Sequence, residues 1–346
     1  MLSGGSMNEQ TRGVNHTTSA LSAWYDVGED FADLVMQHFV GPDYDRTIPI
    51  VSDILNKYDH SRGHIEYALS TNVRGRNVAT WLAKTTDIPA PPGRFLDIGC
   101  AYGGLLHAFS TQGYDVCGIE VDAKVADLGR ANLRALGGRC DITVGDFLHR
   151  CSLESDGTFD LITCSDVIEH VDDPRECLAK IYRLLSPGGV AYVETVNKRS
   201  AINVGRDIHF RIFGLNLLSH HSASAAYKQI TGWPEYMVSD FYHVEWYLAA
   251  CRALGAEVKE LPGSDEAIDF HLASEQLFCR YREWKETTSR KLDFFLRQEI
   301  EEKFFAYCEQ LFAARSRAHL SSTEDDFLKQ WVDPVVRFAI RKPPLS

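Results

Sequence analysis

The chain has 346 residues, of which 45% are hydrophobic, and a formal net charge of −12 at pH 7. No apolar run reaches the length of about 18 residues that a membrane-spanning helix needs. The acidic balance disfavours nucleic acid as a partner, because binding to phosphates usually requires a basic surface. The nine cysteines are scattered without a C-x-x-C pair. This usage argues against a disulfide framework and predicts a cytoplasmic protein with reduced thiols.

The N-terminal part of the chain lacks a strand pattern. Residues 1–22 are predicted to be a tag remnant followed by a polar, disordered N-terminus. Apolar residues at helical spacing predict helices over residues 24–39 and 44–58, and a third helix is expected over residues 75–83. We therefore predict a helical cap over residues 23–92.

A glycine-rich turn follows the first predicted strand, residues 95–98. The helix predicted over residues 104–112 would present its unpaired N–H groups and positive dipole end to a ligand at this turn. The turn lacks the Lys-Ser/Thr ending of a phosphate-binding loop, and Ala101 replaces the second glycine of the dinucleotide fingerprint. Asp97, two residues before Gly99, would repel a pyrophosphate, but it suits a cofactor that carries a positive amino group.

The second and third predicted strands each bring an acidic residue to their carboxyl end. The strand over residues 116–121 contains Glu120, about twenty residues past the turn, where a carboxylate can accept hydrogen bonds from both ribose hydroxyls of a nucleotide. The strand over residues 142–147 ends in Asp146 and Phe147. The pattern indicates a nucleotide-like cofactor at this edge of the sheet.

Further strands are predicted over residues 159–165, 190–194, 256–261 and 276–281, and they alternate with helices as in a doubly wound α/β sheet. In this order, the motifs resemble those of the class I methyltransferases that use S-adenosylmethionine (SAM), whose first motif reads acidic-x-G-x-G-x-G. The resemblance implies a Rossmann-like methyltransferase core over residues 93–285, with a seven-stranded, mostly parallel sheet.

The resemblance also assigns the cofactor contacts. Asp146 would meet the adenine amino group, and Phe147 would pack near the ring. Arg74 or Arg76, just before the core, could bind the cofactor carboxylate through charge-assisted hydrogen bonds, with ordinary surface exposure as the alternative. The predicted cofactor-binding residues are Asp97, Gly99, Cys100, Ala101, Gly103, Glu120, Val121, Asp146, Phe147 and Ser165.

The fourth strand is followed by Asp166, Glu169 and His170. Residues three and four apart share a face of a helical turn, so these side chains can converge. Two carboxylates and an imidazole can bind a divalent cation or support a general base. The segment resembles the E-x-x-E-H motif of two magnesium-dependent methyltransferase branches, one acting on catechol-like quinone precursors and one on the 3′-terminal ribose of small RNAs. His243, before a later helix, is the predicted fourth metal ligand; without metal, His170 alone would face the acceptor.

Two long segments complete the chain. Residues 197–242 lack strict periodicity and are rich in aromatic residues, which is typical of a lid over a pocket for an apolar or aromatic acceptor. His209, His220 and His221 in this segment are interpreted as surface or lid residues in preference to metal ligands. Residues 286–346 are predicted to form a C-terminal helical extension, whose aromatic stripe indicates core packing or a homodimer contact.

The sequence therefore predicts a SAM-dependent methyltransferase that acts on a hydroxyl group of a small molecule. His170, supported by Asp166 and Glu169, is the predicted catalytic group, and Mg²⁺ or another divalent cation is an optional second cofactor. Two alternatives stay open: a metal-dependent RNA 3′-terminal ribose 2′-O-methyltransferase, and a catalytically silent cofactor-binding scaffold.

Overall fold

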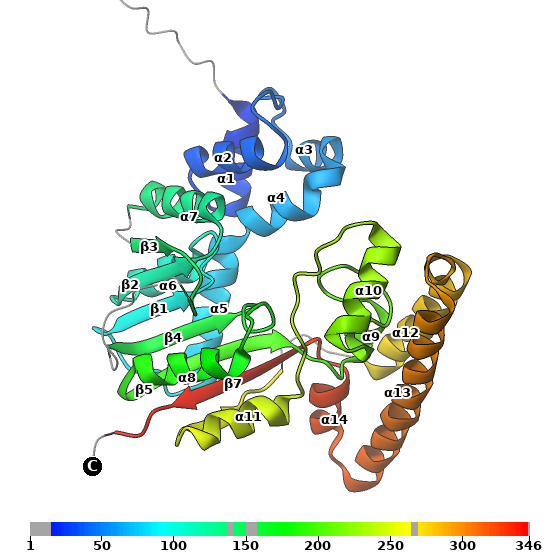
Figure 1. Cartoon of the computed structure of the whole chain (residues 1–346). Helices are drawn as coiled ribbons and strands as arrows, with labels where there is room; N and C mark the ends of the chain where they lie inside the picture. Colours follow the sequence, from blue (N-terminus) through cyan, green and yellow to red (C-terminus); the bar gives the residue numbers. More distant parts are fainter. Residues whose placement is uncertain (1–14, 138–140, 150–157, 264–268, 345–346) are drawn as a thin grey trace, which may run out of the picture.

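A seven-stranded sheet lies below the N-terminal helices in the view of Figure 1, with the strand order β3-β2-β1-β4-β5-β7-β6. The computed structural model describes residues 15–137, 141–149, 158–263 and 269–344. Strands β1 to β5 pair in parallel, whereas β7 runs antiparallel to β5 and β6. The predicted doubly wound, mostly parallel sheet is confirmed. The strands are β1 (Arg94–Ile98), β2 (Asp115–Glu120), β3 (Asp141–Val144), β4 (Phe159–Ser165), β5 (Leu185–Val196), β6 (Glu257–Glu260) and β7 (Val335–Arg341).

The seventh strand does not lie where the sequence predicted it. Residues 276–281 belong to helix α12 (Phe270–Glu286), because their apolar side chains continue the helical spacing of the buried residues Ala273, Leu277 and Trp284. The strand is β7, near the end of the chain. The prediction of a purely helical extension over residues 286–346 is therefore wrong in its last part.

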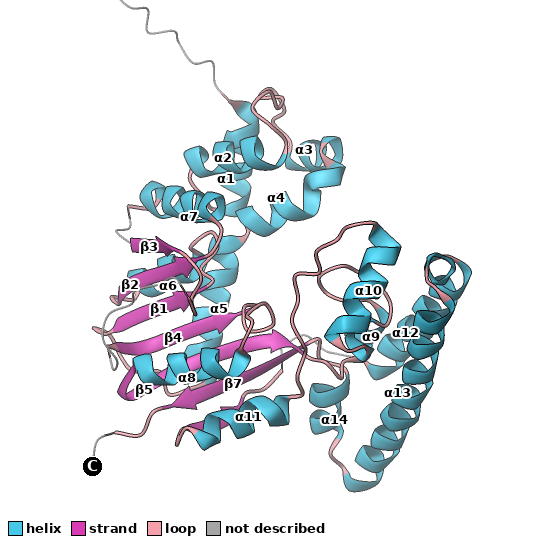
Figure 2. Ribbon diagram, viewed as in Figure 1, coloured by secondary structure: helices cyan, strands magenta, loops and turns pink. Residues whose placement is uncertain are grey.

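Helices cover both faces of the sheet (Figure 2). Successive side chains of a strand point to opposite faces. Accordingly, Leu96 and Ile98 of β1 pack in one core with α8 and α11, while Phe95 packs in another core with α6 and with α5 (Thr71–Thr85). Asp122 and Asp173 cap α7 and α8 by accepting backbone N–H bonds in the first turn. The helices of the central part are α6 (Gly104–Thr111), α7 (Ala123–Ala135), α8 (Pro174–Leu184) and α11 (Val244–Ala253).

Between residues 15 and 93, five α-helices occupy the region predicted to be a helical cap, with boundaries that differ from the predicted ones. They are α1 (His16–Tyr25), α2 (Glu29–Phe39), α3 (Val51–Lys57), α4 (Arg62–Leu69) and α5 (Thr71–Thr85). Helix α1 begins within the stretch predicted to be disordered, residues 1–22, and continues beyond it; the Asn15 side chain caps it by accepting from the Thr18 amide at 3.2 Å. Residues 24–39 do not form one helix, because Asp26 takes a left-handed conformation with φ 55°. Residues 1–14 lie outside the described part.

Helix α5 passes very close to α6. A Cβ atom at Gly75 would lie 2.2 Å from the carbonyl oxygen of Gly104, and a Cβ at Gly104 would lie 2.1 Å from that of Thr71. Only glycine at both positions permits this approach. The contact joins the N-terminal helices directly to the helix that follows the glycine-rich turn.

Replacement of Gly75 by alanine is expected to lower the free energy of unfolding by about 1–3 kcal/mol, because the two helices must separate to admit the methyl group. Gly63→Ala in α4 is the matched control. A Cβ there would meet nothing within 4 Å, and alanine favours a helix over glycine by up to about 1 kcal/mol. Urea denaturation of both variants measures the difference. Equal stability of Gly75→Ala and the wild type would contradict the close packing.

The remaining helices form a separate lobe beside the sheet, which we call the helical lobe (Figure 1). It has its own hydrophobic core, in which Phe213, Trp284, Ile300 and Phe304 are buried together. The predicted lid, residues 197–242, contributes the first two helices of this lobe. The helices of the lobe are α9 (Ala201–Gly205), α10 (His220–Thr231), α12, α13 (Phe294–Ser321) and α14 (Glu324–Trp331).

The aromatic stripe of α13 divides between core and surface. Phe304 and Tyr307 are buried, whereas Phe294, Phe295 and Phe305 are exposed. A homodimer contact through these exposed rings stays a prediction. Among the described helices, none combines the length and the hydropathy that crossing a membrane demands.

Candidate functional site

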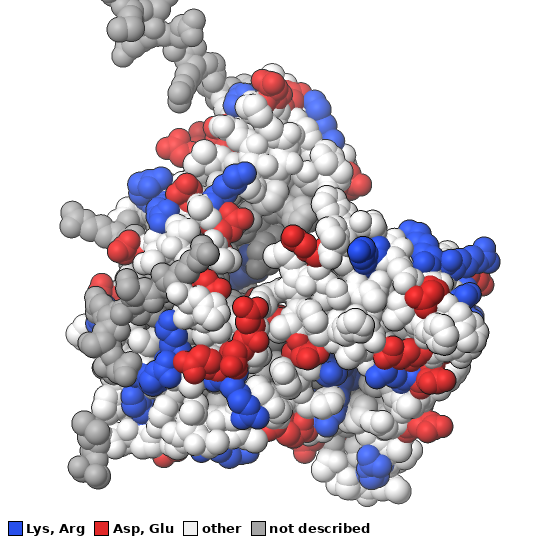
Figure 3. All heavy atoms as spheres, in the orientation of Figure 1, with Lys and Arg blue, Asp and Glu red and all other residues white. Residues whose placement is uncertain are grey.

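A cavity of about 650 Å³ opens where the parallel strands end. Such an edge is where open α/β sheets bind their ligands. The space-filling view shows the surface hollowed between the N-terminal helices and the helical lobe (Figure 3), and the cavity is lined both by Tyr67 of α4 and by residues 236–239 of the lobe. The predicted cofactor residues that line it are Gly99, Ala101, Glu120, Val121, Asp146, Phe147 and Ser165.

Three other residues predicted to bind the cofactor, Asp97, Cys100 and Gly103, are not among the residues that line this cavity. Asp97 is buried and accepts a hydrogen bond from the Thr163 hydroxyl at 2.6 Å. Burial raises the pKa of Asp97 to about 7. Asp97 therefore supports the turn from behind the cavity wall.

The glycine-rich turn needs left-handed backbone at three positions. Gly99 and Gly103 have φ of 73° and 78°, and a Cβ at Gly99 would lie 2.3 Å from the Val167 side chain. Ala101 also has a positive φ of 43°, which costs an alanine about 1–2 kcal/mol. In return, the Ala101 amide donates to Glu120 at 3.0 Å. The turn is thus fixed against the end of β2.

Glu120 is buried at the end of β2, with both carboxylate oxygens hydrogen-bonded. One oxygen accepts from the Ala101 amide, and the other accepts from the Asp122 amide at 2.9 Å. A carboxylate offers about four lone-pair positions, so acceptor capacity is left on the side that faces the cavity. This arrangement can bind a pair of ribose hydroxyls.

Asp146 and Phe147 occupy the end of β3. One oxygen of Asp146 accepts from the amides of Leu148 and His149, at 2.7 and 3.1 Å. The Lys180 ammonium lies 4.7 Å from the centre of the Phe147 ring and also donates to the Phe147 carbonyl. Both side chains are therefore held in place at the wall where the resemblance puts the adenine.

The two arginines before the core have different surroundings. Arg74 lies against Tyr67: it donates to the Tyr67 carbonyl at 2.8 Å, and its guanidinium carbon is 3.6 Å from the ring centre. Tyr67 lines the cavity, and the Nε of Arg74 is buried without a hydrogen-bond partner. Arg76 instead pairs with Asp26 at 2.9 Å. Arg74 is therefore the better candidate for binding a cofactor carboxylate.

Asp166, Glu169 and His170 follow β4 in a turn that starts with Asp166 at φ 54°. Asp166 and His170 line the cavity, whereas Glu169 is fully buried. Burial, together with the charges of Glu169 and Glu194, raises the pKa of Asp166 to about 7. Burial also raises the pKa of Glu169 to about 7. One Glu169 oxygen accepts from the Thr195 hydroxyl at 2.9 Å, and the other, Oε1, is buried without a partner.

The group that converges here includes a histidine that the sequence analysis placed on the lid. Ligand atoms of Glu169, His170 and His209 all lie within 4.8 Å of one another. His209 Nε2 is 3.9 Å from Glu169 Oε1. Burial and the neighbouring His170 lower the pKa of His209 to about 4, so this imidazole is neutral at pH 7.

Two residues of the predicted metal set are not part of this group. His243 stands immediately before α11 and does not join the three converging side chains. Asp166 lines the same cavity but is also outside the group. His209 is carried by a local turn, in which Asp207 accepts from the amides of His209 and Phe210 at 3.0 and 2.7 Å; tertiary packing then brings its ring to Glu169.

A segment of the predicted lid crosses the end of the cavity at which His170 lies. Residues 236–239, which we call the strap, are hydrogen-bonded to the turn after β4. Ser239 donates to the Glu169 carbonyl through its amide and its hydroxyl, at 2.7 and 2.8 Å. His170 Nδ1 lies 2.8 Å from the Met237 carbonyl oxygen. The strap therefore sets the orientation of the His170 ring.

Residues 70–258 match a family model described as a methyltransferase domain. The chain belongs to this methyltransferase family. The predicted membership of the class I SAM-dependent methyltransferases is thereby confirmed, and SAM is the cofactor of this fold.

Curated relatives include ubiquinone biosynthesis O-methyltransferases. The protein of Aromatoleum aromaticum is 34% identical over 110 residues, which cover 30% of this chain and 44% of the relative. That of Psychrobacter arcticus is 31% identical over 138 residues, covering 38% of this chain and 51% of the relative. The chain thus spans about half the length of the curated relatives that it matches.

Similar solved structures are distant in sequence. A SAM-dependent methyltransferase from Mesorhizobium loti has 17% identity and a TM-score of 0.42, covering 76% of this chain and 96% of that chain. Phosphoethanolamine N-methyltransferase 2 of Haemonchus contortus, in complex with SAM, has 16% identity and a TM-score of 0.45, covering 87% and 62%.

Proposed function

We propose that the protein transfers the methyl group of SAM to a hydroxyl group of a small apolar or aromatic acceptor. The observation that carries this proposal is the position of His170, which lines the cavity at the end of β4 with its ring fixed by the strap. Methyl transfer is an in-line displacement, so the protein must mainly place the acceptor oxygen and exclude water. The acceptor proton must also be removed.

His170 is suited to remove that proton. A carbonyl oxygen can only accept a hydrogen bond, so the contact between His170 Nδ1 and the Met237 carbonyl requires a proton on Nδ1. In the neutral ring, Nε2 then keeps a free lone pair. This nitrogen can accept a proton from a hydroxyl group or bind a metal ion.

Glu169, His170 and His209 also fit a divalent cation, because the buried Oε1 of Glu169 has no other partner and both imidazoles are close to it. A cation held there would lower the pKa of a bound hydroxyl group. Two imidazoles and one carboxylate favour ions such as Mn²⁺, Fe²⁺ or Zn²⁺ over Mg²⁺, which prefers oxygen ligands. We therefore propose one of these softer ions in place of the Mg²⁺ that the motif suggested.

The acceptor class is inferred from the rest of the cavity. Tyr67 and Met237 line it outside the predicted cofactor residues and are both largely exposed, so they offer apolar surface to an incoming molecule. The names of the curated relatives place oxygen as the methylated atom and a quinone pathway as the context of those proteins. On the face shown in Figure 3, acidic and basic side chains are interspersed, which favours a small molecule over an RNA backbone.

The cofactor site is tested by replacing Glu120 with glutamine. This variant is expected to bind S-adenosylhomocysteine about 10- to 100-fold more weakly, because a hydrogen bond to a charged group contributes about 1.5–3 kcal/mol. Calorimetric titration measures the change. Glu257→Gln on edge strand β6 removes the same charge from an exposed position and should bind like the wild type. Unchanged binding by Glu120→Gln would contradict the ribose assignment.

The acceptor class is tested by competition during turnover. Small catechols should be methylated, and short duplex RNA should not inhibit their methylation. Strong, salt-sensitive inhibition by RNA would instead favour the ribose-methylating alternative. Tight cofactor binding without transfer to any hydroxyl acceptor would favour the scaffold alternative.

A further inference from the structure

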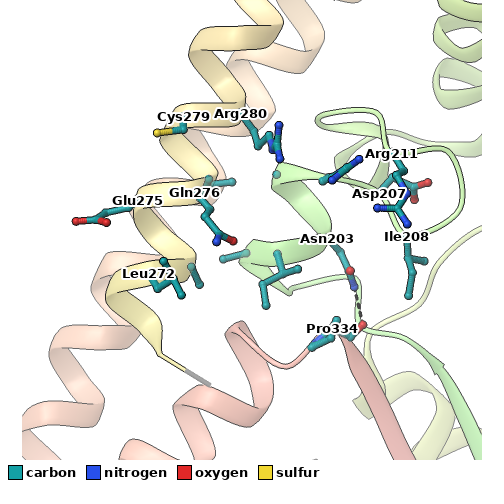
Figure 4. A pocket seen from close by; sticks show the side chains of 16 residues that line it. Asn203, Asp207, Ile208, Arg211, Leu272, Glu275, Gln276, Cys279, Arg280 and Pro334 are labelled. Atoms are coloured by element: carbon teal, nitrogen blue, oxygen red, sulfur yellow. Dashed lines mark hydrogen bonds between the residues drawn. The ribbon is translucent and has the colours of Figure 1, made fainter. Parts of the chain in front are cut away.

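A second cavity, of about 790 Å³, lies in the helical lobe between α9 and α12 (Figure 4). In the part of the chain that the structure describes, no residue lines both this cavity and the cofactor cavity. Its volume is within the range of small-molecule sites. It is therefore a candidate for a ligand other than SAM or the methyl acceptor.

Three arginines line this cavity: Arg206 at the end of α9, Arg211 in the loop that follows, and Arg280 of α12. Figure 4 shows Arg280 projecting from α12 toward the loop that carries Arg211. Arg280 pairs with Glu283 at 2.7 Å. Within the described ranges, no ion pair joins Arg206 or Arg211 to a carboxylate. Burial and the charges of Arg211 and Arg280 lower the pKa of Arg206, against an opposing effect of Glu283.

Glu283 compensates Arg280, but the carboxylates that line the cavity, Asp207 and Glu275, form no ion pair with Arg206 or Arg211 among the described residues. Asp207 is buried: its Oδ1 accepts from the amides of His209 and Phe210, its Oδ2 has no hydrogen-bond partner, and burial raises its pKa to about 6, which favours the uncharged acid over a free carboxylate. Glu275 projects from α12 away from Arg280 (Figure 4). Three guanidinium groups gathered at one cavity are unexpected in a chain with a net charge of −12. A local excess of one charge attracts ligands of the opposite sign.

We propose that this cavity binds a small ligand through a phosphate or diphosphate group. The guanidinium fork matches the oxygens of a phosphate in pairs, and arginine is preferred for this recognition. The exposed side chains of Ile202 and Leu272 line the same cavity and offer apolar contact to the remainder of the ligand. Gln276 adds an exposed amide beside them.

The cavity is linked to the reacting centre through one loop. Arg206 and Arg211 lie at the two ends of this loop, and Asp207 within it lines the cavity and fixes the amide of His209. His209 belongs to the converging group with Glu169 and His170. A ligand that binds both arginines at once would restrict the motion of the loop that carries His209. This consequence rests on the proposed function, whereas the binding itself does not.

The experiment is a calorimetric titration of the full chain with inorganic pyrophosphate at low ionic strength. We expect saturable binding with one site per chain, weakened on the order of tenfold in Arg211→Gln and in Arg280→Gln. Arg317→Gln on α13, an exposed arginine outside the cavity, should leave binding unchanged. Saturating S-adenosylhomocysteine should also leave it unchanged, because the two cavities share no residue.

Inorganic phosphate and citrate distinguish the ligand classes. Phosphate should bind at the same site more weakly than pyrophosphate, and citrate should bind more weakly still. The proposal is overturned by absence of saturable pyrophosphate binding, by competition with S-adenosylhomocysteine, by equal weakening in Arg317→Gln, or by citrate binding as tightly as pyrophosphate. Each variant is first checked by thermal unfolding and by S-adenosylhomocysteine binding. Loss of pyrophosphate binding alone leaves the methyltransferase proposal intact.

Discussion

Replacing His170 with alanine should slow methyl transfer by about 10²–10⁴-fold, the usual contribution of a positioned general acid or base. The affinity for S-adenosylhomocysteine should stay within about twofold of the wild type, because Glu120, Asp146 and Phe147 form the predicted cofactor contacts on other strands. Single-turnover transfer to a catechol acceptor and calorimetry together measure the two quantities. A fall in the rate without a change in cofactor affinity identifies a group that acts on the acceptor.

His220 provides a matched control for the role of the strap. It lines the same cavity, and its Nδ1 lies 2.9 Å from the Val238 carbonyl, as His170 Nδ1 lies 2.8 Å from that of Met237. His220→Ala therefore removes a similar strap contact without touching the converging group. The rate of methyl transfer by His220→Ala should fall by less than about tenfold. Equal losses in the two variants would mean that both histidines only position the strap, and full activity of His170→Ala would reject the catalytic role.

The central sheet was predictable because its signals are local. The first strand, the glycine-rich turn and Glu120 lie within a short segment, and each residue acts through its own position in the chain. The ends of parallel strands meet at one edge, so the sequence order alone brings Glu120, Asp146 and Ser165 to one cavity. Seven of the ten predicted cofactor residues line that cavity for this reason.

The seventh strand was not predictable from local pattern in the same way. Leu277, Phe278 and Cys279 form a short apolar run, and such runs fit either a strand or a buried helix. The chain uses them in α12, where Leu277 and Trp284 enter the core of the helical lobe. Strand β7 comes from the end of the chain, and it is placed by its ladders with β5 and β6.

The choice between His209 and His243 depended on loop geometry. Both follow β5, and both were compatible with a metal site on residue type alone. The Asp207 turn and the ring contacts of His209 with His170 and Phe241 bring His209 to Glu169. Such contacts arise from tertiary packing, which no periodicity in the sequence reports.

The proposed metal site can be tested by comparing the Mn²⁺ affinities of variants at His209 and His243. His209→Ala should weaken Mn²⁺ binding at least about 10- to 100-fold, the loss found when even an outer partner of a metal ligand is removed. His243→Ala should bind Mn²⁺ like the wild type, because the structure places that residue outside the converging group. Electron paramagnetic resonance of free Mn²⁺ measures both affinities without depending on turnover.

Chelation completes the argument, because it separates metal binding from a role in transfer. If the cation acts on the acceptor hydroxyl, EDTA should lower the transfer rate at least about 100-fold and Mn²⁺ should restore it. Bound Mn²⁺ should also stabilise the protein, by about 2.7 kcal/mol at a concentration 100 times its dissociation constant, since it supplies a partner for the buried Oε1 of Glu169. If His209→Ala still binds Mn²⁺ and His243→Ala does not, the metal site formed by Glu169, His170 and His209 is wrong. Full activity in EDTA would leave His170 as the sole group that removes the proton.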